Sequence, residues 1–286
     1  MSRVEMNMGE ALRLPAPAKL NLMLRIVGRR QDGYHLLQTV FQFIDVCDWI
    51  TLRASADGRV GLKSPLPGVP EASDLTVRAA MALKSAAGVS EGAIIKVEKN
   101  LPMGGGLGGG SSDAATTLLG LNRLWKAGLS LNELKDLGLG LGADVPVFIE
   151  GHAAWAEGVG EELTPLDLPE PWYVVIVPGC HVATAEVFSH PDLTRNNPPI
   201  TIRDFFEGHQ ENHCLPVVRV LYPKVVEAIA DISRYAPGRL TGTGSCVFAE
   251  FESERAAREA SAALSPKWTA LVARGVNESP LTTHLR

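Results

Sequence analysis

The sequence predicts an α+β protein that is organised in two parts. Near its start, apolar residues recur at every second position, which is typical of a strand with one buried face. A β-like run over residues 93–98 then leads through a glycine-dense loop into a helical run over residues 114–125. Beyond the Pro-rich segment 164–172, short helices and strands alternate, which favours a small α+β sandwich. We therefore divide the chain into residues 1–163 and 164–286.

The first predicted strand covers residues 12–27, where leucines alternate with other residues. Lys19 and Asn21 share the face opposite these leucines, which places an ammonium group beside an amide. From spacing alone, we expect this face to be solvated. The next turn carries Tyr34 and His35, which could stack on a ligand ring and hydrogen-bond it, although such pairs more often serve packing.

Two strands over residues 36–43 and 49–54 come next, followed by a helix over residues 74–87. Ser73 or Asp74 is expected to cap the start of this helix, which ends at a glycine. The strand over 93–98 and the glycine loop follow.

The glycine loop holds six glycines within seven positions, between a strand and a helix. Because glycine loses much conformational freedom on folding, such a run is expected where a close backbone approach or a positive φ is required. Its unhindered N–H groups would form an anion-binding concavity, to which the start of the next helix adds its own N–H groups and dipole. Ser111 and Ser112 are expected to cap that helix and to offer hydroxyls to a phosphate or its metal ion.

Two better-known phosphate loops fit less well. The P-loop pattern requires Gly-Lys, a pair that occurs nowhere in the chain. The dinucleotide pattern G-x-G-x-x-G matches at Gly104, Gly106 and Gly109, but two helices follow where a second parallel strand ending in an acidic residue is required. A dinucleotide-dependent oxidoreductase is therefore the alternative, and a non-catalytic nucleotide-binding module is a second one.

Asp144 follows a helix predicted over residues 131–139 and precedes a run expected to form a strand over 145–149. A carboxylate at this junction serves either a turn or cap, or a functional site. His209 and His213 are four residues apart, but the H-E-x-x-H order is missing, so a metal site is not favoured.

Composition narrows the classes of partner. The net charge is −5 with no dense Lys/Arg run, which argues against nucleic acid or a membrane surface as partner. The four scattered cysteines, Cys47, Cys180, Cys214 and Cys246, form no C-x-x-C pair and favour free thiols in a reducing compartment. The polar N-terminus and the absence of a long apolar run predict a cytoplasmic protein.

Residues 17–22, 102–114 and 240–246 resemble the three motifs of the GHMP kinases, a family of small-molecule kinases unrelated to P-loop enzymes. Residues 33–35, 141–146 and 156–160 are similar to one branch of that family. The resemblance implies an N-terminal ATP-binding α+β domain and a C-terminal ferredoxin-like domain. It also implies ATP-dependent phosphorylation of the tertiary 2-hydroxyl of a cytidine diphosphate-linked methylerythritol, in non-mevalonate isoprenoid biosynthesis. Mg²⁺ would be a cofactor, and the protein would be a monomer or homodimer.

The resemblance also assigns roles to residues. It implies a catalytic pair in which Asp144 accepts the hydroxyl proton and Lys19 keeps Asp144 ionised and offsets charge on the transferring group. The triphosphate loop would comprise Pro102, Met103, Gly104, Gly105, Gly106, Leu107, Gly108, Gly109, Gly110, Ser111 and Ser112, with Lys99 and Asp74 near the adenine. The substrate residues would be Tyr34, His35, Val159 and Phe188 around the cytosine, with Asn21 and Thr184 at the sugar-alcohol end. The metal ligands stay unassigned beyond the two serine hydroxyls.

Overall fold

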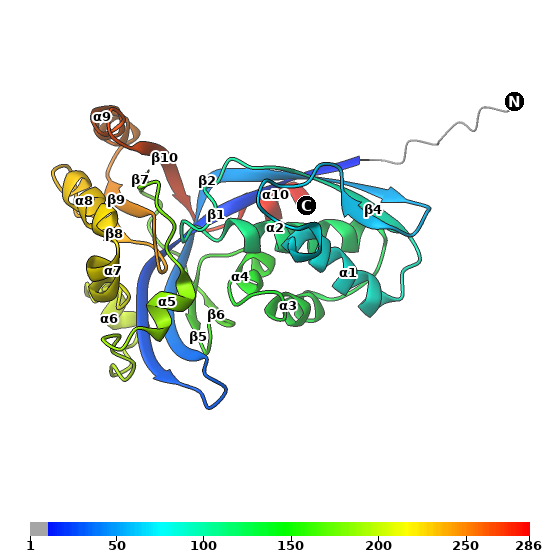
Figure 1. Ribbon diagram of the computed structural model, residues 1–286, viewed down its shortest axis with the longest axis horizontal. Coiled ribbons are helices and arrows are strands. Elements are labelled where there is room, and N and C mark those ends of the chain that lie inside the picture. The colour runs from blue at the N-terminus through cyan, green and yellow to red at the C-terminus, as the bar shows by residue number, and fades with distance from the viewer. Residues whose placement is uncertain (1–10) are drawn as a thin grey trace, which may run out of the picture.

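The computed structural model describes residues 11–286 and has two lobes joined by long strands (Figure 1). The polar N-terminal segment, on which the prediction of a cytoplasmic protein partly rests, lies almost entirely outside the described residues. Within residues 11–286, no helix is both long enough and apolar enough to cross a bilayer.

The strands β1 (Ala11–Arg29) and β2 (His35–Ser55) form a long antiparallel hairpin. The two strands predicted over 36–43 and 49–54 are thus one continuous strand. On the other side of β2 lies β4 (Gly92–Glu98), to which β3 (Val60–Leu62) adds in parallel. Further along the hairpin, β5 (Ala154–Glu157) pairs with β2, and β6 (Glu162–Pro165) pairs with β5.

The helices of the first lobe pack against this sheet around a core that includes Phe41, Leu52, Leu118 and Phe148. They are α1 (Leu75–Ala87), α2 (Gly109–Leu124), α3 (Leu131–Leu139) and α4 (Val145–Glu150), with a short 3₁₀ turn, η1 (Glu71–Ser73), before α1. Asp74 caps α1 by accepting from the N–H groups of Thr76 and Val77, as the sequence predicts.

Two local predictions were wrong. Helix α2 begins at Gly109, after an N-cap glycine, so Ser111 and Ser112 lie inside its first turn and do not cap it. Residues 145–150 form helix α4 rather than a strand. A short apolar run does not distinguish a buried strand from a buried helical turn, and Pro146 near the start of the helix fits the position where proline is tolerated.

The second lobe has the ferredoxin-like arrangement. Its antiparallel strands β7 (Trp172–Val177), β8 (Arg239–Leu240), β9 (Val247–Phe251) and β10 (Thr269–Val276) lie in the spatial order β10-β7-β9-β8. Helices stand between β7 and β8 and between β9 and β10, which gives a β-α-β-β-α-β succession. The helices are α5 (Thr184–Ser189), α6 (Ile202–Phe206), α7 (Leu215–Leu221), α8 (Pro223–Ile232) and α9 (Glu254–Leu264).

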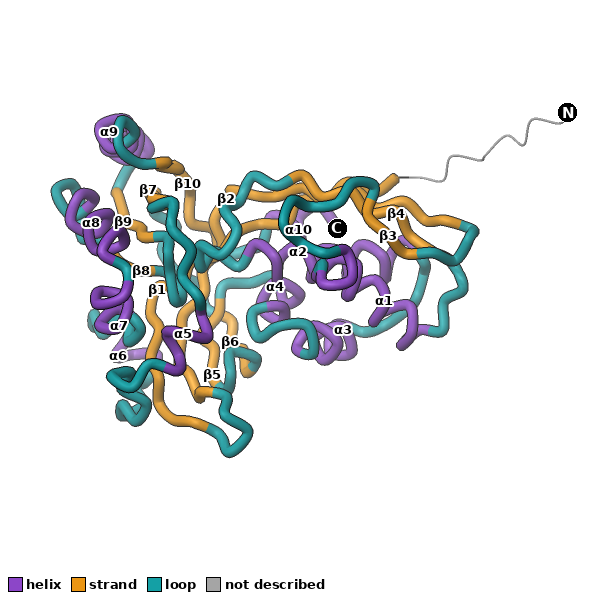
Figure 2. The backbone as a smooth tube through the Cα atoms, viewed as in Figure 1, coloured by secondary structure: helices purple, strands orange, loops and turns teal. Residues whose placement is uncertain are grey.

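The two lobes share one sheet, because β10 pairs with β7 and also with the middle of β2. Figure 2 shows the strands continuing from one lobe into the other, with helices flanking them at both ends. The last helix, α10 (Pro280–Leu285), returns to the first lobe and contacts β1. The division at residues 163 and 164 stays a prediction.

Candidate active site

The glycine loop connects β4 to α2, and backbone hydrogen bonds join it to two other segments of the chain. The N–H of Lys19 on β1 donates to the carbonyl of Leu107 at 3.0 Å, and the N–H of Cys246 donates to the carbonyl of Gly105 at 3.0 Å. Thr241 links β1 to the glycine loop, because its hydroxyl accepts from the N–H of Asn21 and donates to the carbonyl of Gly106. Three segments far apart in the sequence therefore meet at this loop.

Several glycines in the loop are required by its shape. Gly104, Gly106 and Gly108 have φ between 69° and 79°, in the left-handed region. A Cβ atom on Gly106 would stand 2.4 Å from the carbonyl oxygen of Thr241, so no side chain fits there. The next residues begin α2, whose first N–H groups have no partner within the helix. The loop thus presents backbone donors where an anion can approach closely.

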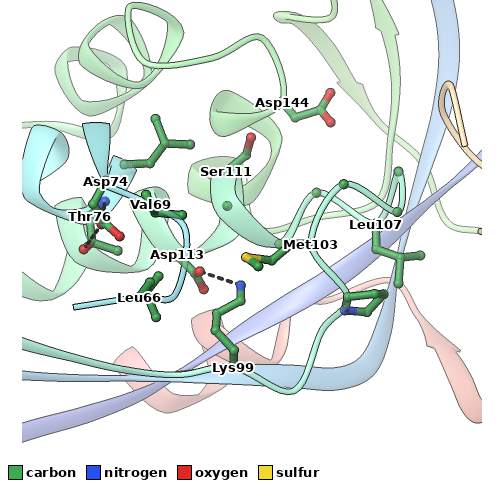
Figure 3. Close-up of a pocket in the computed structure, with 18 of the residues that line it drawn as sticks. Leu66, Val69, Asp74, Thr76, Lys99, Met103, Leu107, Ser111, Asp113 and Asp144 are labelled. Atoms are coloured by element: carbon green, nitrogen blue, oxygen red, sulfur yellow. Dashed lines mark hydrogen bonds and ion pairs between the residues drawn. The ribbon is translucent and has the colours of Figure 1, made fainter. Parts of the chain in front are cut away.

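These donors border a cavity of about 390 Å³. It is lined by the loop from Pro102 to Ser111, by Lys99, Asp74 and Asp113, and by Asp144. Figure 3 shows Asp144 and Ser111 toward one end of this cavity, with Asp74 and Val69 toward the other. Ser112 lies fully buried, away from this lining, so of these two serines Ser111 is the one that lines the cavity.

Lys19 is buried, and its ammonium group lies 3.1 Å from a carboxylate oxygen of Asp144. The same ammonium donates to the side-chain oxygen of Asn21 and, at 3.2 Å, to the carbonyl of Gly106. Asn21 in turn donates to the hydroxyl of Thr39 at 2.9 Å. The prediction of a solvated face was therefore wrong, because the glycine loop and Thr241 cover the side of β1 that carries Lys19 and Asn21.

Asp144 precedes α4 without capping it through its side chain. Of the two roles that the sequence left open, the structure thus does not support the cap. The side chain of Asp144 is 34% exposed, whereas that of Lys19 is 3% exposed, so the carboxylate is the member of the pair that a ligand can reach.

Lys99 belongs to a buried acidic cluster with Asp48 and Asp113. Its ammonium contacts a carboxylate oxygen of Asp48 and lies 2.8 Å from one of Asp113. The other oxygen of Asp48 accepts from the N–H of Leu101 at 2.8 Å, at the foot of the glycine loop. Burial raises the pKa of Asp113 to about 7, an effect that Lys99 opposes and Asp48 reinforces. The cluster therefore anchors the loop and α2 to β2.

Asp74 lines the same cavity, but one of its oxygens is engaged by α1, accepting from the N–H of Thr76 at 2.8 Å. Sequence reasoning missed Asp48, and it gave Asp113 no role although that residue lies within a quoted motif. No local pattern marks either one as a partner of Lys99.

A second cavity, of about 330 Å³, lies on the other side of Lys19 and Asp144. The two cavities share a wall, because four residues line both of them: Gly104, Gly106, Ser111 and Asp144. Asn21 and Thr184 line the second cavity, and the hydroxyl of Thr184 lies 2.9 Å from that of Thr243. Thr39 was not identified from the sequence, and Thr241 and Thr243 were given no role although both lie in the motif over residues 240–246.

A third cavity, of about 540 Å³, is continuous with the second through shared lining that includes Val159, Thr184 and Phe188. It holds Tyr34, which is 62% exposed, and His35. The ring of Phe188 stacks on His35, with centroids 4.9 Å apart and planes 25° from parallel. Phe188 therefore covers the imidazole of His35, and both side chains line the third cavity.

Of the two histidines at positions 209 and 213, His213 has a partner in the fold. The Nδ1 atom of His213 accepts from the N–H of Ile26 at 3.3 Å, which is a structural role. Across residues 11–286, no group of three or more His, Cys, Asp or Glu side chains converges to hold a metal ion.

The fold and the loop define a class of protein, and comparison with known sequences agrees. Residues 74–152 match the family description "GHMP kinases N terminal domain", and residues 197–270 match "GHMP kinases C terminal". The chain belongs to the GHMP kinase family and is a small-molecule kinase.

Particular relatives narrow the class. The chain is 62% identical to the 4-diphosphocytidyl-2-C-methyl-D-erythritol kinase of Methylococcus capsulatus, over 95% of this chain and 94% of that protein. It is 58% identical to the enzyme of the same name from Nitrosococcus oceani, over 93% and 95%. A crystal structure of 4-(cytidine 5'-diphospho)-2C-methyl-D-erythritol kinase superposes with a TM-score of 0.80 at 34% identity, covering 92% of this chain and 99% of that one. The oxidoreductase alternative is not favoured.

Proposed function

We propose that this protein transfers the γ-phosphoryl group of ATP to the 2-hydroxyl of 4-diphosphocytidyl-2-C-methyl-D-erythritol, giving the 2-phosphate and ADP. The observation that carries the proposal is the continuous cleft in which Asp144 stands in the wall between two cavities. One cavity offers backbone donors suited to a triphosphate. The other leads away from the catalytic pair toward the aromatic and imidazole side chains of the third cavity.

The residues of the cleft then have separate tasks. The loop from Pro102 to Ser111 would bind the β- and γ-phosphates through N–H groups, with the adenine toward Lys99 and Asp74. Asn21 and Thr184 would contact the sugar-alcohol end of the substrate. Tyr34, His35, Val159 and Phe188 would surround the cytosine in the third cavity.

The reaction requires a hydroxyl oxygen to attack the γ-phosphorus while the bond from that phosphorus to the β–γ bridging oxygen breaks. Catalysis of phosphoryl transfer is mainly positioning and charge stabilisation. Asp144 accepts the hydroxyl proton, because its carboxylate is the reachable base at the shared wall. Lys19, held by Asn21 and Gly106, offsets negative charge on the transferring group.

Mg²⁺ fits the same place. This ion is usually bound through one or two carboxylates together with substrate phosphates, and it keeps several of its waters. The hydroxyl of Ser111 lines both cavities and would hold the ion together with the substrate phosphates. When bound, Mg²⁺ would neutralise charge on the phosphates. That the enzyme works in the cytoplasm, as a monomer or homodimer and without nucleic acid or membrane partners, stays a prediction.

The test is product analysis by ³¹P NMR after incubation with ATP, Mg²⁺ and the cytidylyl methylerythritol. We expect equal amounts of ADP and of a new phosphomonoester. Free methylerythritol, offered at the same concentration, is the control that tests whether the cytidine diphosphate group is required. Absence of phosphoryl transfer would reject the kinase reaction, and equal phosphorylation of the free alcohol would reject the cytidine assignment.

A further inference from the structure

Arg195 lies outside every motif discussed above, yet its guanidinium group is held by four hydrogen bonds. Its Nη1 donates to the carbonyl of Leu193 at 2.9 Å, and its Nη2 donates to the carbonyls of Phe188 and His190, both at 2.8 Å. Its Nε donates to Nε2 of His35 at 3.1 Å. Among residues 11–286, no carboxylate forms an ion pair with this group, so charge neutralisation does not explain its position.

The bond to His35 fixes where the imidazole carries its proton. A guanidinium group donates hydrogen bonds and never accepts them, so Nε2 must present its lone pair to Arg195. The single proton of the neutral ring then resides on Nδ1. Burial, Arg195 and Arg29 together lower the pKa of His35, which favours the neutral ring. Phe188 stacks on the ring face and, through its carbonyl, also holds Arg195.

The Nδ1–H group is a donor without a protein partner within the described residues, on a ring that lines the third cavity. A cytosine offers an unprotonated ring nitrogen, N3, on its pairing edge, whereas a uracil carries a hydrogen at N3. A fixed donor therefore suits cytosine and leaves two donors facing each other with uracil. The opposite tautomer would present a lone pair, which suits the N3–H of uracil, and would reverse this preference.

We infer that Arg195 is a positioning residue, which fixes the Nδ1–H tautomer of His35 and thereby sets the preference for a cytosine over a uracil base. The inference rests on the proposed function for its substrate, but the tautomer is a property of the free protein. Arg195 acts through His35 and does not itself touch the reacting atoms.

The first measurement is a long-range ¹H–¹⁵N correlation spectrum of the substrate-free protein, labelled with ¹⁵N-histidine. The signals of His35 are identified by their loss in His35→Ala, since the chain has seven histidines. We expect a protonated Nδ1 and an unprotonated Nε2. A ring protonated on Nε2 would overturn the inference, whatever the activity of the enzyme.

The second measurement compares kcat/KM for the cytidine substrate and its uridine analogue in Arg195→Met. We expect their ratio to fall about tenfold, the order expected for losing a hydrogen bond with a charged donor. If Arg195 only stiffened the segment that carries Phe188, both substrates would lose equally, and an unchanged ratio would refute the inference. Arg203→Met, at an exposed arginine of α6 paired with Glu207, should leave the ratio as in the wild type.

Two outcomes separate the hypotheses. A wild-type protein that does not phosphorylate the cytidine substrate would reject the proposed function while the tautomer of His35 stays measurable. If Arg195→Met fails to fold, as circular dichroism would show, the wild-type spectrum alone still decides whether Nδ1 is protonated.

Discussion

Replacing Asp144 by asparagine removes the proposed base while keeping the shape of the side chain. The carboxylate is partly exposed, and Lys19 keeps two neutral acceptors, Asn21 and the carbonyl of Gly106. We therefore expect the free energy of unfolding to change by only about 1 kcal/mol. The catalytic effect should be larger. A positioned general base contributes about 10²–10⁴-fold, which corresponds to about 3–5 kcal/mol in activation free energy.

The assay is single-turnover kinetics by rapid quench with labelled ATP, because product release can conceal a slower chemical step. The Kd for ATP should stay near the wild-type value, since the N–H groups of the glycine loop are untouched. Asp167→Asn, at a side chain that is 93% exposed, is the matched control and should have wild-type kinetics. If Asp144→Asn transferred phosphate at a rate within tenfold of the wild type, Asp144 would not be the base.

Three further predictions concern the loop, the buried cluster and the base pocket. Gly106→Ala places a methyl group against a backbone carbonyl at φ 79° and should greatly weaken ATP binding, measured by calorimetry. The control is Gly88→Ala, at φ 64° with open space around it. This variant should lose only about 1–2 kcal/mol of stability and should bind ATP as the wild type does. The folded-state pKa of Asp113, about 7, lies above its ordinary value of 3.8, so its contribution to stability is fully present below about pH 4 and is lost as the pH rises through 7. Urea unfolding from pH 4 to 8 should show this loss, up to about 4 kcal/mol, in the wild type but not in Asp113→Asn, and parallel profiles would contradict it. Phe188→Ala should lower kcat/KM for the cytidine and uridine substrates alike, by the equivalent of about 1–3 kcal/mol. His35→Ala should chiefly lower the ratio of kcat/KM for the cytidine substrate to that for the uridine substrate. An unchanged ratio in His35→Ala would remove His35 from base recognition.

The glycine loop was predictable because its signals are local. A strand, six glycines and a helix follow one another within about 35 residues, and each has a distinct pattern. Asp74 and the glycine that follows α1 were found for the same reason, since caps are read from a few adjacent positions. The family motifs implied the ferredoxin-like fold of the second lobe, whose strand order no periodicity contains.

The environment of Lys19 and Asn21 was not predictable from spacing. Alternation along a strand tells which residues share a face, but it does not tell what covers that face. The cover here includes Thr241, whose hydroxyl bonds a residue 220 positions earlier in the chain. Arg195 is likewise far from His35 in the sequence, at a separation of 160 residues, and lies in a stretch without regular structure. Such pairs leave no local pattern because the fold, not the sequence neighbourhood, brings them together.

The course of β1 explains why Lys19, a member of the proposed catalytic pair, lies where the lobes meet. Ala16 packs in the core of the first lobe, whereas Leu24 and Ile26 pack in the core of the second. Lys19 and Asn21 stand between these two anchors, at the point where the glycine loop bonds to β1. A displacement of one lobe against the other would therefore strain β1 at the residues that hold the ammonium group. Because β1 is anchored in both lobes, the position of Lys19 depends on the packing of both. The position of a lysine on a surface loop would not depend on it.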